Sequence, residues 1–591
     1  MAFVRRFRGL AAGLVLLVVG APTGAGADPP GPHRVIREFG VRMRTSDGVA
    51  LVADVYRPDT AGRSPAILVR TPYTRTGGAQ FDAGTYWASH GYAYVVQDVR
   101  GRGDSEGEFE PLVHEGRDGF EAQGWVASQP WSNGRVGTWG GSYLGWTQVL
   151  SAPLNHPALG ALIPMVTPSD PGGFWPMRRG GIVLGMLEWA LVTEGRTVRD
   201  VPGDHPDLVA AYRSLPLRSI DERIGMPSRV WRDYLAHLDD SAYWAPRSYQ
   251  HRLPEARAPM FHVTGWYDGT LGGSLENFAT MRARAGPAVR DGHYLLVGPW
   301  RHWVDTDSRS RTLGGIDLGA ASQVDTYRQY RLWFDHQLRG QANEVGSWPR
   351  VRVFALGANR WIGAAEWPVP GTRFVPYYLH GARAGVPAAG RLAVELPPGA
   401  GGTDRYEYDP SDPTPFLWSR NLDSGGPDDY RSVEARRDVL VYTMPSPPRP
   451  LTVCGPIRAT LQAATSARDT DWVARLTLVR PDGYSQRLTE GWVRARARDG
   501  EFRRSPLPPN VAVEYQIDLW GTCVVVRPGE RLRLAVMSAA FPLLARNLNT
   551  GGDLGAETEG VVARQAIHHE PGRLSYLTLP IIDRPNWIPK P

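Results

Sequence analysis

The stretch Val136-Gly137-Thr138-Trp139-Gly140-Gly141-Ser142-Tyr143-Leu144-Gly145 decides how this chain folds. It reads as a short strand, a tight turn bounded by glycines, and a helix that continues through Trp146 and Leu150. Glycines flank the serine because a side chain there would collide with the neighbouring backbone. A serine at such a turn exposes its hydroxyl at the tip of a strand, so we predict that Ser142 occupies the nucleophile elbow of a serine hydrolase.

Two later stretches supply the acid and the histidine that such a serine needs. The apolar run 260–264 leads into Asp268, and the apolar run 293–297 leads into His302. Open α/β sheets place their ligands at the carboxyl ends of strands, where both residues would lie. The chain order of serine, acid and histidine is that of the α/β hydrolases. The elbow pattern alone could arise by chance in a chain with 67 glycines, so the prediction depends on all three residues.

The first third of the chain alternates strand and helix patterns. Residues 35–55 read as a β-hairpin, 66–69 and 92–96 as strands buried on both faces, and 120–128 as a helix. This alternation predicts a mostly parallel, doubly wound α/β sheet. A helical pattern at 323–338 would close this core domain.

Strand patterns disappear between the serine and the acid. Helices are expected there at 185–192, 208–214 and 231–238, where a cap over the active site would be inserted. From about residue 351 short apolar runs recur between Pro- and Gly-rich turns, which predicts an antiparallel sandwich or jelly roll. We therefore divide the chain into a signal peptide (1–27), a core in two parts (28–169 and 257–342), a helical cap (170–256) and a C-terminal jelly roll (343–591).

The N-terminus has the three parts of an export signal. Arg5, Arg6 and Arg8 precede an apolar core at 10–20 that is too short to anchor in a bilayer, and Ala25-Gly26-Ala27 is a small-x-small cleavage site. No other apolar run is long enough to span a membrane. We expect cleavage before Asp28 and a mature protein that is secreted or periplasmic and does not contact the membrane.

The charge pattern does not indicate a nucleic-acid partner. The net charge is +6, and removing the three signal arginines from 66 basic residues leaves 63 against 60 acidic ones. The remaining basic residues are scattered rather than gathered in a stripe. We therefore expect a small-molecule partner and no nucleic acid, and we make no prediction of the oligomeric state.

The cysteines and histidines do not suggest a metal site or a cofactor. Cys454 and Cys523 lie in strand-like segments and could form one disulfide in an oxidising compartment or remain two buried thiols. The adjacent pair His568-His569 cannot face one metal from a regular element, and we expect it at the surface. Asp98 and Asp104 flank a glycine-rich loop without the lysine of a phosphate loop, and they are expected to bind backbone or arginine rather than metal.

These motifs, together with Arg70-Thr71-Pro72-Tyr73 after a core strand, resemble the cocaine esterase-like (CocE/NonD) hydrolases. That group is related to α-amino acid ester hydrolases, glutaryl acylases and Xaa-Pro dipeptidyl-peptidases. The resemblance covers essentially the whole mature chain. It implies an α/β-hydrolase core with an inserted helical cap and a C-terminal jelly roll of the Xaa-Pro dipeptidyl-peptidase type.

The expected catalytic roles follow from chemistry and from this resemblance. His302 would take the proton of Ser142 and later protonate the leaving group, while Asp268 would orient the imidazole. The backbone N–H of Tyr143 would be one oxyanion donor. The resemblance implies that the phenol of Tyr73 is the second; the alternative is a packed core tyrosine with a satisfied hydroxyl.

The substrate is harder to predict than the mechanism. In relatives that act on α-amino acid esters, acidic residues after the catalytic acid bind the ammonium, but residues 269–272 contain none, and neither does the start of the cap at 172–175. We therefore expect a neutral or aromatic acyl group, because a buried ammonium would lack a partner. Three tryptophans would either line the acyl pocket or pack the cap onto the core: Trp175, Trp189 and Trp266.

The leading prediction is a serine esterase that cleaves small carboxylic esters, and by extension amides, through an acyl-enzyme. An Xaa-Pro dipeptidyl-peptidase, an acylase or an acyltransferase would use the same triad. A carbohydrate-binding protein with an inactive core is the alternative from another class. The presence of every expected catalytic residue argues against it.

Overall fold

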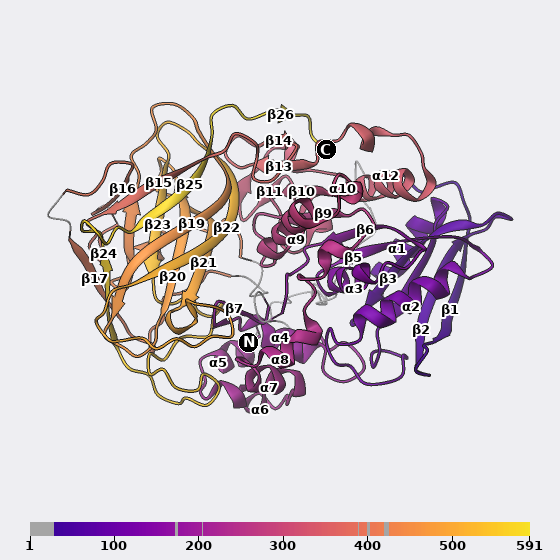
Figure 1. The fold of residues 1–591 in the computed structure, drawn as a ribbon, viewed down its shortest axis with the longest axis horizontal. Coiled ribbons are helices and arrows are strands. Elements are labelled where there is room, and N and C mark those ends of the chain that lie inside the picture. Colours follow the sequence, from indigo (N-terminus) through magenta and orange to yellow (C-terminus); the bar gives the residue numbers. More distant parts are fainter. Residues whose placement is uncertain are drawn as a thin grey trace, which may run out of the picture.

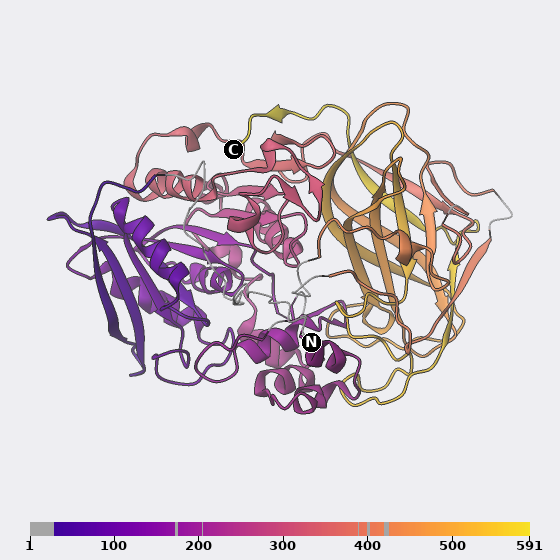
Figure 2. The same cartoon turned by 180° about the vertical axis from the view of Figure 1, so that it is seen from behind.

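The computed structural model describes residues 29–171, 175–201, 203, 205–387, 389–398, 402–418 and 425–591. The predicted signal peptide (1–27) and residues 172–174 at the start of the predicted cap lie outside these ranges. Two large sheets lie side by side, and a group of short helices sits below their junction (Figure 1). The view from behind shows the same three parts (Figure 2).

The first sheet has eleven strands in the order β1-β2-β4-β3-β5-β6-β9-β10-β13-β14-β26. Every pairing from β4 to β13 is parallel, and antiparallel pairs flank this run at both edges. The doubly wound α/β prediction is therefore confirmed, as is the hairpin at its start. The strands are β1 Val35–Arg44, β2 Ala50–Pro58, β3 Ser64–Thr71, β4 Ala93–Asp98, β5 Ser132–Gly141, β6 Leu159–Met165, β9 Phe261–Gly265, β10 Tyr294–Gly298, β13 Val351–Ala355, β14 Arg360–Ala364 and β26 Trp587–Ile588.

Helices cover both faces of this sheet because successive residues of a strand point to opposite sides. On β5, Gly137 faces α12, and a β-carbon there would lie 2.5 Å from the ring of Phe334. The next residue, Thr138, faces α3 and donates to the side-chain oxygen of Gln148 at 3.1 Å. The helices of this domain are α1 Gly78–Ser89, α2 Glu115–Ala127, α3 Tyr143–Ser151, α9 Leu271–Arg284, α10 Pro287–Arg290, α11 Val304–Asp307 and α12 Thr326–Arg339.

The cap lies between β6 and β9 in the chain and has a core of its own. Its helices are α4 Gly185–Val192, α5 Pro206–Tyr212, α6 Ile220–Arg223, α7 Arg229–Ala236 and α8 Ser241–Trp244, with a short hairpin of β7 Met177–Arg178 and β8 Gly181–Ile182. The three helices predicted in this segment are confirmed. Buried Trp231 and Trp244 anchor the cap core, and the Ser228 side chain accepts from the Trp231 N–H at the start of α7.

The second sheet is almost wholly antiparallel; its one parallel pair is β16 with β18. Its strands are β15 Arg373–His380, β16 Gly390–Ala393, β17 Thr403–Tyr408, β18 Leu440–Thr443, β19 Leu451–Thr465, β20 Asp471–Val479, β21 Ser485–Arg494, β22 Val513–Val526, β23 Arg531–Met537, β24 Ala563–His568 and β25 Tyr576–Ile582. Smaller elements are β11 Thr312–Leu313, β12 Ile316–Asp317 and α13 Arg431–Glu434. Cys454 on β19 stands opposite Cys523 on β22, and the two are joined by a disulfide.

The boundary between the two sheets differs from the sequence prediction. We assigned the whole of 343–591 to the jelly roll, but β13 pairs with β10, β14 pairs with β13, and β26 pairs with β14. The apolar run at 351–354 has the composition expected of a jelly-roll strand. Only its pairing with β10 shows that it belongs to the first sheet. The chain therefore enters the second domain after β14 and returns to the first sheet at β26.

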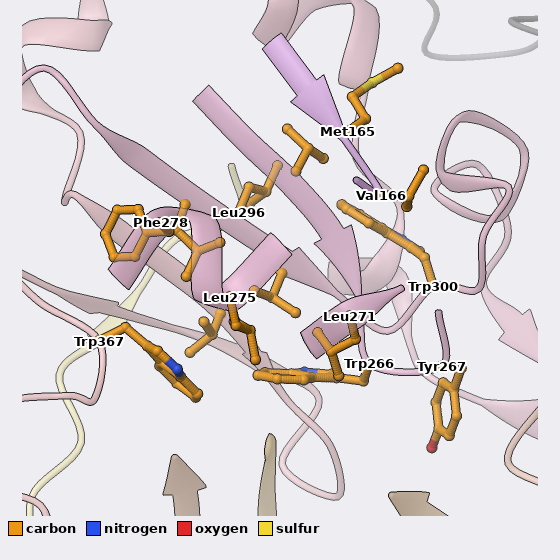
Figure 3. Packing of buried hydrophobic residues seen from close by; sticks show 14 of the residues in the cluster. Met165, Val166, Trp266, Tyr267, Leu271, Leu275, Phe278, Leu296, Trp300 and Trp367 are labelled. Atoms are coloured by element: carbon orange, nitrogen blue, oxygen red, sulfur yellow. The ribbon is translucent and has the colours of Figure 1, made fainter. Parts of the chain in front are cut away.

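Two tryptophans from the loops after β9 and β14 lie beside α9. Figure 3 shows Trp266 and Trp367 beside Leu271 and Leu275 of α9. The indole N–H of Trp266 donates to the Phe354 carbonyl on β13 at 2.6 Å. Among the residues that the structure describes, no helix is both long and apolar enough to cross a bilayer.

Candidate active site

Ser142 lies between the end of β5 and the start of α3, as the elbow pattern predicts. Its backbone has φ 58° and ψ −122°, a conformation that non-glycine residues rarely adopt. The Ser142 N–H donates to the Met165 carbonyl at 2.9 Å, which anchors the turn to β6. The flanking glycines are needed, because a β-carbon at Gly140 would lie 2.6 Å from Leu144 and one at Gly145 would lie 2.0 Å from Thr167.

The loops after β9 and β10 bring Asp268 and His302 together. A β-carbon at Gly265 would lie 2.1 Å from the Trp300 carbonyl oxygen, so glycine lets these two loops touch. The Tyr267 N–H donates to the same carbonyl at 2.9 Å. His302 Nδ1 then lies 2.8 Å from Asp268 Oδ1, and both side chains are buried. Asp268 therefore holds the imidazole at its Nδ1.

Two threonines that sequence reasoning missed hold the Asp268 carboxylate. The hydroxyls of Thr264 and Thr270 each lie 2.8 Å from Oδ2, and the Thr270 N–H donates to Oδ1 at 3.0 Å. They stand four residues before and two residues after the acid, and nothing in that spacing distinguishes them from ordinary strand and turn residues. Their contacts fix the carboxylate so that Oδ1 faces His302.

Ser142 and His302 line one pocket. The pocket also contains the predicted residues Tyr73, Trp175 and Trp189. Its wall is largely aromatic, because two further tryptophans, Trp146 and Trp303, contribute to it. The structure therefore brings the serine, the histidine and the proposed oxyanion tyrosine to one concave site.

Trp266 does not lie in this pocket, unlike the other two tryptophans predicted there. It lines a second pocket, which shares Trp175 with the first. Trp266 also packs against Trp367, with ring centroids 5.9 Å apart. Its indole N–H bonds to the Phe354 carbonyl on β13.

The phenol of Tyr73 is positioned by the cap. The indole N–H of Trp189 donates to the Tyr73 hydroxyl oxygen at 3.0 Å. This bond uses a lone pair of the phenol and not its proton. Tyr73 is 7% exposed and lines the pocket, so its position is compatible with the predicted donor role.

Tyr143, the first residue of α3, is anchored by its side chain. Its hydroxyl donates to Glu115 Oε1 at 2.8 Å and accepts from the Leu112 N–H at 2.9 Å. Burial raises the pKa of Tyr143 well above its usual value, so the phenol stays protonated. Burial also raises the pKa of Glu115, although the Arg70 guanidinium lies 2.7 Å away and opposes that shift. This network fixes the position of Tyr143, whose backbone N–H directly follows Ser142 in the chain.

Arg102 connects the loop before Tyr73 to the cap. It is fully buried and donates through Nε to the Pro72 carbonyl at 2.6 Å and through Nη1 to the Thr193 carbonyl at 2.6 Å. Thr193 is the C-cap of α4, the helix that carries Trp189. Sequence reasoning missed this role, because the glycine-rich loop containing Arg102 was assessed only for phosphate and metal binding.

Glu188 is another pocket residue that sequence reasoning missed. It lies on α4, is 6% exposed and lines the Ser142 pocket. The sequence prediction considers carboxylates only after Asp268 and at the start of the cap. The available signal was a single acid inside the otherwise apolar helix Gly-Met-Leu-Glu-Trp-Ala-Leu-Val.

The residues considered as metal ligands have other partners. Asp98 and Asp104 both pair with Arg75, which confirms the arginine alternative. His569 was expected at the surface, but it is only 4% exposed, with Nε2 3.2 Å from Asp404 Oδ2. It is buried because the pairing of β24 with β17 folds the following residue against Asp404. Within the described part of the chain, no group of three or more acidic, histidine or cysteine side chains could hold a metal.

Comparison with known proteins places this geometry in a family. The profile of the X-Pro dipeptidyl-peptidase (S15 family) matches residues 47–304, and that of the X-Pro dipeptidyl-peptidase C-terminal non-catalytic domain matches residues 343–578. A cocaine esterase from Rhodococcus sp. (strain MB1 Bresler) is 33% identical over 589 residues, covering 94% of this chain and 100% of that protein. The chain belongs to the cocaine esterase-like (CocE/NonD) hydrolase family.

Solved structures of similar proteins cover the same length. An α-amino acid ester hydrolase has a TM-score of 0.81 and 26% identity, covering 97% of this chain and 100% of that one. An aminopeptidase from the marine sediment archaeon Thaumarchaeota archaeon has a TM-score of 0.80 and 26% identity, covering 95% and 99%. This CocE/NonD protein is thus a serine hydrolase with an α/β-hydrolase fold and a C-terminal β-rich domain.

Proposed function

We propose that Ser142, His302 and Asp268 form a catalytic triad that cleaves small carboxylic esters and, by the same steps, amides. The observation that carries this proposal is the 2.8 Å contact between His302 Nδ1 and Asp268 Oδ1 beside a pocket that Ser142 and His302 both line. In a triad whose acid contacts Nδ1, Nε2 is the nitrogen that acts as base.

The reaction would proceed through an acyl-enzyme. His302 Nε2 takes the Ser142 proton as Oγ attacks the carbonyl carbon, and the imidazolium then protonates the departing alcohol as the C–O bond breaks. Water attacks the acyl-enzyme by the same route and regenerates Ser142. Asp268 stabilises the imidazolium without taking its proton.

Two donors would stabilise the oxyanion of the tetrahedral intermediate. One is the backbone N–H of Tyr143 at the start of α3, and the other is the phenol of Tyr73. The support for Tyr73 is its place in the pocket together with the bond from Trp189, which holds its hydroxyl oxygen without using its proton.

A second candidate is an Xaa-Pro dipeptidyl-peptidase with the same triad, which the S15 family match favours. That activity requires recognition of a free N-terminus. An acylase or acyltransferase would form the same acyl-enzyme from another donor or pass it to another acceptor.

The decisive experiment compares the protein from Asp28 onward with its Ser142→Ala variant. Both are assayed on an aryl acetate, an aryl benzoate, a phenylglycine ester and a Gly-Pro anilide. We expect Ser142-dependent turnover of the esters. Strong cleavage of the Gly-Pro anilide would favour the peptidase, and equal rates for the two proteins on every substrate would refute the triad.

We further propose that the chain is exported and processed at residues 27–28. The proposal rests on the basic start, the short apolar core and the small residues of the first 27 positions. Expression of the full chain followed by N-terminal sequencing of the extracytoplasmic product should yield Asp28 as the first residue. Retention of Arg5, Arg6 and Arg8 in that product would refute it.

A further inference from the structure

The β-rich domain contacts the loop that carries Asp268. This acid loop, residues 266–270, joins β9 to α9. The hydroxyl of Tyr267, the residue before the acid, accepts a hydrogen bond from the side-chain nitrogen of Gln486 on β21 at 2.8 Å. Tyr267 is 2% exposed and Gln486 is 3% exposed, so bulk water does not compete for this bond.

The side chain of Gln486 is itself fixed within the β-rich domain. Its amide oxygen accepts from Arg480 Nη2 at 2.8 Å, which directs the amide nitrogen toward Tyr267. The guanidinium of the next residue, Arg487, lies 5.7 Å from the centre of the Tyr267 ring, within the range of a cation–π contact. Strand β21 therefore holds the phenol through two neighbouring residues.

The β-rich domain also meets the chain just beyond the acid loop. Gly272 lies in the first turn of α9, and a β-carbon there would lie 2.5 Å from the indole of Trp520 on β22. On the core side, the Tyr267 N–H donates to the Trp300 carbonyl, two residues before His302. The acid loop is thus held between the loop that carries His302 and two strands of the β-rich domain.

We infer that Gln486 is a positioning residue for the catalytic acid, through which the β-rich domain keeps Asp268 in contact with His302. The inference rests on the proposed function, because it concerns the acid of the same triad. The two threonines that bond to the carboxylate orient it within the loop, whereas the bond from Gln486 to Tyr267 fixes the loop itself. A misplacement of about 1 Å between catalytic groups can cost about 100-fold in rate, so the loss of one such anchor should be measurable.

Removing either partner of this bond tests the inference. We expect Gln486→Leu to lower kcat on an aryl acetate about 10–100-fold, with KM within about threefold of the wild type, because the acid acts in the transition state. Tyr267→Phe removes the acceptor and should have the same effect. A wild-type kcat in both variants would overturn the inference.

A second buried glutamine of the same domain provides the matched control. Gln565 on β24 is 1% exposed, and its side-chain nitrogen donates to the Thr470 hydroxyl at 2.7 Å. Gln565→Leu removes the same amide without a contact to the acid loop, so kcat should stay at the wild-type value. An equal loss of kcat in Gln565→Leu and Gln486→Leu would mean that any disturbance of the β-rich domain has this effect, which contradicts a specific role for Gln486.

A double variant separates positioning from stability. Each single variant leaves one buried polar group without its partner and should therefore lower the free energy of unfolding in urea. Tyr267→Phe combined with Gln486→Leu removes both groups, so this free energy should return toward the wild-type value while kcat stays about 10–100-fold low. A kcat that recovers together with the stability would show that the bond only stabilises the fold.

A spectroscopic measurement needs no turnover. A proton held between an imidazole nitrogen and a carboxylate gives a proton NMR line far downfield of the backbone amides, and its loss in Asp268→Asn assigns this line to His302. We expect the line to move upfield in Gln486→Leu, because the contact between the acid and the imidazole lengthens, and to stay in place in Gln565→Leu. An unmoved line in Gln486→Leu would refute the inference. Equal turnover by the wild type and Ser142→Ala would instead refute the proposed function, and the NMR comparison would still decide the role of Gln486.

Discussion

At the scale of single residues, Tyr73 lines the pocket, and its hydroxyl oxygen accepts a hydrogen bond from the cap. The Trp189 indole holds the oxygen, so removal of the hydroxyl removes both this bond and the proposed oxyanion donor. We expect Tyr73→Phe to lower kcat by about 10²–10³-fold with KM little changed, because the donor acts mainly in the transition state. Steady-state kinetics on an aryl acetate measure this.

A control for that substitution is Tyr484→Phe in the second domain. The Tyr484 hydroxyl donates to the Pro427 carbonyl at 2.8 Å, and the residue does not line the Ser142 pocket. It should leave kcat unchanged. A rise in KM at constant kcat in Tyr73→Phe would mean that the phenol binds the ground state and would rule out the oxyanion role.

At the scale of elements, the position of α4 relative to the core determines the shape of the site. Arg102 ties the C-terminal end of α4 to Pro72, the residue before Tyr73. We expect Arg102→Lys to lower kcat/KM about tenfold, because an ammonium cannot reproduce the guanidinium's two well-separated bonds. If Arg102 acts through Tyr73, the double variant with Tyr73→Phe should lose little more than Tyr73→Phe alone.

The kinetic comparison needs a control for the arginine replacement. Arg117→Lys changes an arginine whose side chain is 63% exposed and should leave kcat/KM unchanged. Independent, additive losses in the double variant would show that Arg102 does not act through Tyr73.

The sequence predicts elements well where one strong local pattern determines them. The strand–turn–helix at Ser142, the strands before Asp268 and His302, and the helix at 185–192 were all foreseen. The pairing of strands could not be predicted in the same way. The composition of β13 is that of a jelly-roll strand, and only its pairing with β10 assigns it to the first sheet. Glu188 was missed because helix periodicity does not reveal which face meets a pocket.

At the scale of the whole molecule, two buried histidines should make the fold sensitive to acid. His262 on β9 and His293 just before β10 have ring centroids 6.3 Å apart, and neither ring has a hydrogen-bond partner among the described residues. Burial lowers the pKa of His293 to about 3 and that of His262 well below its usual value. Both are therefore neutral in the folded protein.

The sign of the pH effect follows from these shifts. The unfolded chain takes up protons near pH 6.5 and the folded one only near pH 3, so stability is complete above about pH 6.5 and falls as the pH drops toward 3. At pH 5 His293 alone should cost about 2 kcal/mol of unfolding free energy. Urea unfolding measures the free energy of unfolding at pH 7 and at pH 5. The decrease in this free energy from pH 7 to pH 5 should be about 2 kcal/mol smaller in His293→Leu than in the wild type.

An exposed histidine provides the comparison. His205 has a side chain that is 54% exposed, and we expect His205→Gln to leave the loss of stability between pH 7 and pH 5 unchanged. A drop of the same size in His293→Leu and in the wild type would mean that other groups account for the acid sensitivity.

The last strand of the chain has a mechanical consequence. Because β26 lies against β14, the polypeptide leaves the hydrolase sheet and later rejoins it, so two chain connections join the β-rich domain to that sheet (Figure 1). A protease that cut one of these chain connections would leave the β-rich domain covalently joined to the hydrolase sheet by the other. A fusion partner joined to the carboxyl terminus would emerge beside the hydrolase sheet and far from the outer strands of the β-rich domain.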